Sequence, residues 1–199
     1  LLGLLFAVLF AVLAAGVMAF FTLYYKTNII LGGIAINSLA SGGTIFFLYL
    51  VAHDKGTSVS LPSKVLPNIN IPLIGDIPII GPVISGHNVL TYVAVLAVLF
   101  TWYLLKRTPL GYHLRAVGEK KEAADSVGIS VIKTQTIALL LSGLMCGFGG
   151  AFMSMGYVSW FSRDMISGRG WIALAAEAMG MQHPLGTAAT SLLFGVADA

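Results

Sequence analysis

Charge is scarce in this chain of 199 residues, because Asp, Glu, Lys and Arg together make up only 10% of it. A typical soluble domain carries about 25% charged residues. Here 57% of the residues are hydrophobic and the mean hydropathy is +0.91, so we predict an integral membrane protein. The one cysteine, Cys146, can form no disulfide within the chain and leaves the redox compartment open.

Motifs for chemistry are also lacking. The four histidines have no metal-ligand spacing, and no GxxxxGK[ST] segment forms a phosphate-binding loop. No nucleophile is paired with a base, so an intramembrane enzyme ranks last. The net charge of +3 comes from basic residues beside apolar runs, which argues against nucleic acid as a partner. We therefore expect no catalytic residue, metal or bound cofactor, and an energy source in a partner or a gradient.

One long polar segment, residues 106–136, interrupts the apolar sequence. It holds six of the eleven basic residues and only three acids, so the positive-inside rule places it in the cytoplasm. Pro109 and Gly111 are expected to break the preceding helix, and Gly118 to interrupt the segment. A short helix is predicted from Glu119 to Val127, ended by Gly128. Its small apolar face suits docking into a groove on a soluble partner; that face consists of Ala123, Ala124 and Val127.

Four apolar runs are long enough to cross a bilayer, which takes about 20 residues. They are Leu1–Leu23, Ile29–Val51, Val89–Leu105 and Ile137–Tyr157. The second is rich in small and polar residues, so we expect it inside the helix bundle and away from lipid. In the fourth, Gly143, Gly147 and Ala151 have the spacing of a tight helix crossing.

Two regions lie opposite the cytoplasmic segment by the count of crossings. Residues 52–88 hold five of the seven prolines and are expected to form an extracytoplasmic loop, either a docking site or a plain lid. After a second outer loop at 159–170, the run Trp171–Gly180 is too short to cross, and Gln182, His183 and Pro184 follow it. This interruption is typical of a half-helix or re-entrant element near a transport path, although a plain short helix explains it nearly as well.

Several stretches carry a family resemblance. Glu122, Ala123 and Ala124, followed after three residues by Gly128, resemble the EAA loop of ATP-binding-cassette importer permeases. The wider sequence is similar to permeases of nucleoside and simple-sugar uptake, which are related to the branched-chain amino acid and ribose permeases. The similar stretches are RTPLGYHLRAVGEKKEAADSVGI, INIPLIGDIPIIGPVISGHN, LLSGLMCGFGGAFMSMGYV, GRGWIALAAEAMG and HPLGTAATSLLFGVADA. The resemblance implies an all-α, polytopic transmembrane helix bundle. We expect residues 1–199 to be a single permease domain and, since both ends fall in apolar runs, a fragment of a longer permease.

The resemblance also implies partners and a mechanism. The chain would form one half of a dimeric pathway in the plasma membrane, with a second permease subunit, a cytoplasmic ABC ATPase that uses the ATP, and an extracytoplasmic substrate-binding protein. The substrate would be a nucleoside or a simple sugar. Contact with the ATPase would fall on residues of the cytoplasmic segment; these are Glu119, Glu122, Ala123, Ala124 and Gly128. The alternative is a secondary transporter driven by an ion gradient, with Glu177 as its intramembrane acid.

Four residues are candidates for the substrate pathway: Asn37, Phe46, Met153 and Glu177. The Asn37 amide could meet a ribose hydroxyl or a base edge and resembles the asparagine of the family's GIAxN segment, although an interhelical hydrogen bond explains it equally well. Phe46 and Met153 could pack against a base or sugar face, but packing between helices is the commoner role. Glu177 departs from the family pattern, and we favour a solvated half-helix end over a specialised site.

Overall fold

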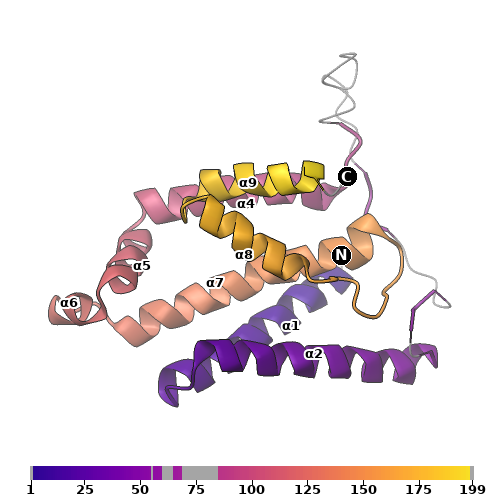
Figure 1. Ribbon diagram of the computed structural model, residues 1–199, viewed down its shortest axis with the longest axis horizontal. Coiled ribbons are helices and arrows are strands. Elements are labelled where there is room, and N and C mark those ends of the chain that lie inside the picture. The colour runs from indigo at the N-terminus through magenta and orange to yellow at the C-terminus, as the bar shows by residue number, and fades with distance from the viewer. Residues whose placement is uncertain (1, 55, 60–64, 69–84, 198–199) are drawn as a thin grey trace. The chain divides into compact units, whose positions relative to one another are not determined.

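The computed structural model describes residues 2–54, 56–59, 65–68 and 85–197. Its helices are α1 (Leu2–Ala19), η1 (Phe20–Tyr24), α2 (Ile29–Ala52), α4 (Val89–Arg107), α5 (Pro109–Glu119), α6 (Lys121–Ser126), α7 (Val131–Phe152), η2 (Met153–Tyr157), α8 (Arg169–Met179) and α9 (Pro184–Ala197) (Figure 1). η1 and η2 are single π-helical turns. Within the described ranges the chain forms no strand, only isolated bridges, which confirms the all-α prediction.

Four helices are long and apolar enough to cross a membrane: Leu2–Tyr24, Ile29–Ala52, Val89–Arg107 and Val131–Gly156. They confirm the four predicted spans to within a few residues at most ends. The largest difference is at α7, which begins at Val131, six residues before the predicted start. The Thr134 hydroxyl and amide both donate to the carbonyl of Ser130, at 2.9 and 3.0 Å, and so extend the helix into the polar segment.

The chain divides into two compact units. The first contains Leu1–Ala94 and Leu139–Met165, and the second contains Val95–Ala138 and Ile166–Ala199. Both α4 and α7 begin in one unit and end in the other. That residues 1–199 act as one permease domain stays a prediction.

In the first unit, α1 and α7 cross at glycines. A Cβ added at Gly147 would lie 2.8 Å from the Val8 Cα and 3.1 Å from the Ala11 Cβ, and one added at Gly143 would overlap the Ala15 Cβ. Ala151, one turn farther along α7, is only 1% exposed. The predicted tight crossing is therefore confirmed, because only the missing side chains allow the two backbones to approach so closely.

Backbone hydrogen bonds join the loops at one end of this unit. Ser58 N–H donates to the Phe161 carbonyl (2.9 Å), and Leu66 N–H donates to the Met155 carbonyl (3.0 Å). Residues 56–59, 65–68 and 85–88 are non-helical, as predicted for 52–88, while 60–64 and 69–84 lie outside the described residues. The end of α2, the end of η2 and the start of α4 therefore share one face. That this face lies outside the cytoplasm stays a prediction.

In the second unit, α8 and α9 pack against each other as a helical hairpin. The 11 residues of α8 span roughly 16 Å at 1.5 Å per residue, about half of a 30 Å hydrocarbon core, so the prediction of a helix too short to cross is confirmed. The turn is tight because a Cβ at Gly180 would overlap the backbone of Thr187. Across the pair, the Thr190 hydroxyl donates to the Ala176 carbonyl (2.6 Å).

Candidate functional site

The chain turns sharply between α4 and α5. Pro109 occupies the first turn of α5, where no helical N–H is needed. The Thr108 hydroxyl accepts a hydrogen bond from Gly111 N–H (3.2 Å) and lies 2.6 Å from the Leu104 carbonyl, to which it donates. A Cβ at Gly111 would overlap the Leu104 carbonyl. Pro109 and Gly111 do end α4, as predicted, but they also begin a second helix that the sequence reading missed.

Side chains hold α5 close to the end of α4. The Tyr112 hydroxyl donates to the Lys106 carbonyl (3.1 Å), which leaves fewer unsatisfied carbonyls at the α4 C-terminus. The Arg115 guanidinium lies 5.2 Å from the centre of the Tyr112 ring, within cation–π range. Tyr112 thus joins α5 to the last turn of α4, which carries Lys106 and Arg107.

The second short helix, α6, is the core of the predicted coupling segment. The prediction of one helix from Glu119 to Val127 is wrong at its start, because Lys120 is extended (φ −152°) and separates α6 from α5. Glu119 is therefore the last residue of α5, and Gly118 lies inside α5 and does not interrupt it. Glu122 lies in the first turn of α6, where a negative charge stabilises the helix dipole.

Gly128 ends α6 as predicted. Its φ of +83° is a left-handed conformation that costs little only for glycine. Gly128 N–H donates to the Asp125 carbonyl (2.9 Å), and Ile129 N–H donates to the Ala124 carbonyl (3.0 Å). These two bonds form a Schellman motif. The chain reaches α7 at Val131 after only four residues, so α6 and α7 are closely linked.

The exposed face of α6 differs from the predicted one. Ala124 is only 3% exposed, and α6 packs against α5, where Val117 is also buried. Val127 is 74% exposed, and Glu122 and Ala123 are also exposed. We call Glu122, Ala123 and Val127 the coupling surface, after the role predicted for this segment. Ala124 lies inward because a six-residue helix resting on α5 turns one of its small residues toward that helix.

The four predicted pathway residues are not gathered into one described pocket. Asn37 and Phe46 are exposed on α2, Met153 is half-buried in η2, and Glu177 is exposed on α8. The first three belong to the first unit and Glu177 to the second. α2 is in contact with another helix near its start, where a Cβ at Gly32 or Gly33 would lie 3.8 Å from the Met18 Cε, whereas a Cβ at Gly42, farther along α2, would meet no atom within 4 Å.

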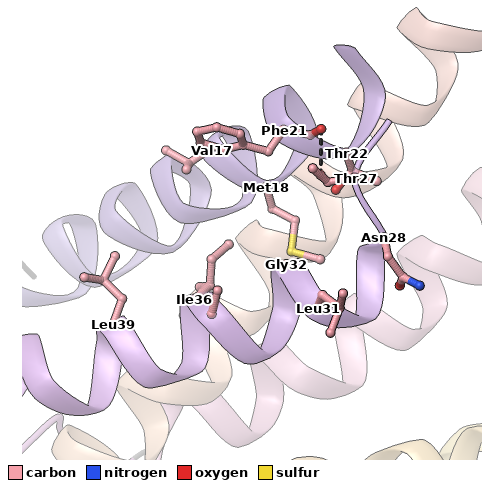
Figure 2. A pocket seen from close by; sticks show the side chains of 11 residues that line it. Val17, Met18, Phe21, Thr22, Thr27, Asn28, Leu31, Gly32, Ile36 and Leu39 are labelled. Atoms are coloured by element: carbon pink, nitrogen blue, oxygen red, sulfur yellow. Dashed lines mark hydrogen bonds between the residues drawn. The ribbon is translucent and has the colours of Figure 1, made fainter. Parts of the chain in front are cut away.

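A groove of about 490 Å³ lies between α1, η1 and α2 (Figure 2). Sequence reasoning did not find it, because it depends on how two spans meet at the short turn after η1. The Thr27 hydroxyl donates to the Phe21 carbonyl (2.8 Å) and closes that turn. The Thr22 hydroxyl is buried at the contact with Gly32, and no partner for it is found in the described part of the chain.

Asn88 is a buried polar residue that sequence reasoning also missed. It is 7% exposed; its amide NH₂ donates to the Leu66 carbonyl (3.1 Å) and its oxygen accepts from Leu90 N–H (3.0 Å). It thus caps the start of α4 and holds a loop segment that is distant in sequence. The available signal was an asparagine directly before an apolar run, the usual N-cap pattern.

Comparison with known proteins gives the family. The family model described as "Branched-chain amino acid transport system / permease component" matches residues 1–199. The chain belongs to this permease family. A guanosine ABC transporter permease, NupQ of Bacillus subtilis, is 35% identical over 196 residues, which cover 96% of this chain and 61% of the relative.

Other members of the permease family are similar over nearly the whole chain. A nucleoside ABC transporter permease, NupC of Lactococcus lactis, is 32% identical, covering 98% of this chain and 61% of the relative. A putative glucose ABC transporter permease, TsgC13 of Haloferax volcanii, is 31% identical, covering 93% of this chain and 55% of the relative. The chain thus spans about three-fifths of the length of these relatives. No solved structure matches. Membership and the four apolar helices make this permease chain a multi-pass protein of the plasma membrane.

Proposed function

We propose that the chain is the larger part of a membrane-spanning permease subunit of an ATP-binding-cassette importer that carries a nucleoside or a simple sugar. Family membership and relatives named as guanosine, nucleoside and glucose permeases support this reading. In this proposal the chain binds no cofactor of its own, and a cytoplasmic ATPase subunit hydrolyses the ATP. A second permease subunit completes the pathway, and an extracytoplasmic binding protein delivers the substrate.

The observation that carries the proposal is the geometry of α6. The helix is supported on one side by α5 and ended by the hydrogen bonds around Gly128. Its other side is the coupling surface, which offers a small residue, an apolar residue and an acid. A displacement of α6 by the ATPase would reach α7 through four residues only. This arrangement suits a coupling element that shifts the permease between two packings.

Asn37, Phe46, Met153 and Glu177 are proposed to line the substrate pathway. A neutral, hydroxyl-rich substrate needs donors and acceptors without a fixed charge, and the exposed Asn37 amide supplies both. In hydrocarbon, an amide without a hydrogen bond is costly, roughly 2–7 kcal/mol by transfer. This cost favours contact of Asn37 with water, substrate or another polar group over contact with lipid.

Placing a bulky charge on the coupling surface tests the proposal. In the full-length permease expressed with its ATPase, Ala123→Arg should abolish complex formation and ATP-dependent uptake, because this exposed alanine would lie in the ATPase groove. His113→Arg adds the same side chain at an exposed position on α5 and should leave both intact. Ala124→Arg is a poor test, since Ala124 is buried and the change would disrupt α5–α6 packing. Normal assembly and uptake in Ala123→Arg would refute the coupling assignment.

The energy source separates the proposal from the ion-gradient alternative. Uptake should persist when the membrane gradient is collapsed while ATP is maintained, and Glu177→Gln should not change its dependence on ATP. Loss of uptake with the gradient, despite ample ATP, would identify a secondary transporter instead.

A further inference from the structure

The groove between α1, η1 and α2 is apolar along most of its length. Met18 reaches across it toward Gly32, as Figure 2 shows. Its lining combines small residues of α2 with larger apolar side chains of both helices. The lining residues are Val17, Met18, Phe21, Thr22, Thr27, Asn28, Leu31, Gly32, Ala35, Ile36 and Leu39.

The length of the groove matches one half of a bilayer. From Asn28 to Leu39 the groove follows eleven residue steps of α2, roughly 16 Å at 1.5 Å per residue. Half of a hydrocarbon core of about 30 Å is about 15 Å. A single extended acyl chain from one leaflet would therefore run the whole length of the groove.

Charge and aromatic rings mark the polar end of the groove. Lys26 is exposed and directly precedes Thr27, which lines the groove. In the turn before Lys26, the centre of the Phe20 ring lies 5.6 Å from that of Tyr24 and 5.5 Å from that of Tyr25; such rings are typical of the headgroup level. This turn lies one crossing before the outer loop, so it falls on the cytoplasmic side, where anionic lipids are concentrated.

The opposite side of α2 indicates which way the groove faces. At 3.6 residues per turn, Asn37 lies about 160° around the helix from Ala35 and from Leu39 in the groove. If Asn37 faces the pathway, the groove faces away from it and toward lipid. This step rests on the proposed function. It also revises the expectation that α2 lies inside the bundle and away from lipid, since the helix would separate the pathway from the bilayer.

We propose that this groove is a binding site for an anionic phospholipid of the cytoplasmic leaflet. One acyl chain lies along α2 from Asn28 to Leu39, and the phosphate-bearing headgroup lies beside Lys26. The neutral Thr27 and Asn28 side chains occupy the level between them. The Thr27 hydroxyl and the Asn28 amide oxygen already bond the backbone at Phe21 and Ile30, so Lys26 supplies the selectivity for negative charge.

Lipid retention by the purified full-length permease complex tests the site. The complex is equilibrated with phosphatidylglycerol and phosphatidylcholine of identical acyl chains, and retained lipid is counted by native mass spectrometry. Phosphatidylglycerol should be retained preferentially. Lys26→Gln should reduce that preference about fivefold, the effect of one basic residue near an anionic headgroup, and Lys26→Arg should keep it.

Filling the groove provides a second, independent test. A Cβ at Gly32 would lie 3.8 Å from the Met18 Cε, an ordinary contact, so Gly32→Leu should fold and expel the acyl chain. Gly42→Leu places the same side chain on α2 outside the groove, in open space, and should retain lipid. Equal retention in these two variants, or a lipid preference that Lys26→Gln does not change, would overturn the proposal.

ATP-dependent uptake by the same preparations keeps the two proposals separable. Normal uptake without selective lipid retention would reject the lipid site alone. Selective retention in a permease whose uptake needs no ATP would reject the transport mechanism and keep the lipid site.

Discussion

The crossing of α1 and α7 gives the sharpest test of the packing. Gly147→Ala would place a Cβ 2.8 Å from the Val8 Cα, which is backbone and cannot rotate away. Overpacking of this kind costs about 1–3 kcal/mol. Gly150→Ala, on the same helix, would meet no atom within 4 Å. Both variants gain the same benefit of alanine over glycine in a helix, roughly 0.5–1 kcal/mol. Their difference in unfolding free energy therefore isolates the clash.

The assay is unfolding of the detergent-purified full-length permease by SDS titration, followed by tryptophan fluorescence. Gly147→Ala should be less stable than Gly150→Ala by about 1–3 kcal/mol. A double-mutant cycle sharpens the result, because Gly143→Ala would overlap the Ala15 Cβ and Ala15→Gly removes that atom. The pair should be more stable than the sum of the single changes predicts. Equal stability of Gly147→Ala and Gly150→Ala, together with strict additivity in the cycle, would refute the close approach of the two helices.

Three further changes test local features. Gly128→Val places a β-branched residue at φ +83°, which should cost roughly 1–2 kcal/mol or more and make proteolysis of the α5–α6 segment faster. Gly118→Ala, in open space on α5, should not increase cleavage. Asn88→Leu leaves the part-buried Leu66 carbonyl and the buried Leu90 N–H without their bonds and should lower the free energy of unfolding by about 1–3 kcal/mol for each. Asn88→Ser should retain the helix cap and lose less. Thr190→Val removes the hydroxyl bonded to α8 and should destabilise the α8–α9 pair by about 1 kcal/mol, which hydrogen exchange would show as faster exchange in α8. Thr190→Ser keeps a hydroxyl and should leave the exchange rate in α8 unchanged.

The spans and the end of α6 could be predicted from sequence because each depends on local signals. An apolar run of about 20 residues has few alternatives to a membrane helix, and a glycine after EAADSV is a common helix end. The small-residue spacing of Gly143 and Gly147 also indicated a close crossing, although it could not identify α1 as the partner helix.

The errors occurred where a residue has two local meanings or where a contact joins distant segments. Pro109 stops one helix and starts the next, and only the stop was predicted. Ala123 and Ala124 are chemically identical, and only packing against α5 shows which of them is available to a partner. The groove along α2 and the bonds of Asn88 join residues through tertiary contacts that no periodicity in the sequence records.

The hydrogen bonds near Ser58 and Phe161 have a mechanical consequence. Three hydrogen bonds of 2.8–2.9 Å link residues 56–58 with 161–163, so the far ends of α2 and of the α7–η2 helix are fastened to each other. The 22 residues of α7 form a rod of roughly 33 Å that starts four residues after α6. A displacement of the Val131 end along the axis of α7 would therefore also displace the far end of α2, so the two helices should move together.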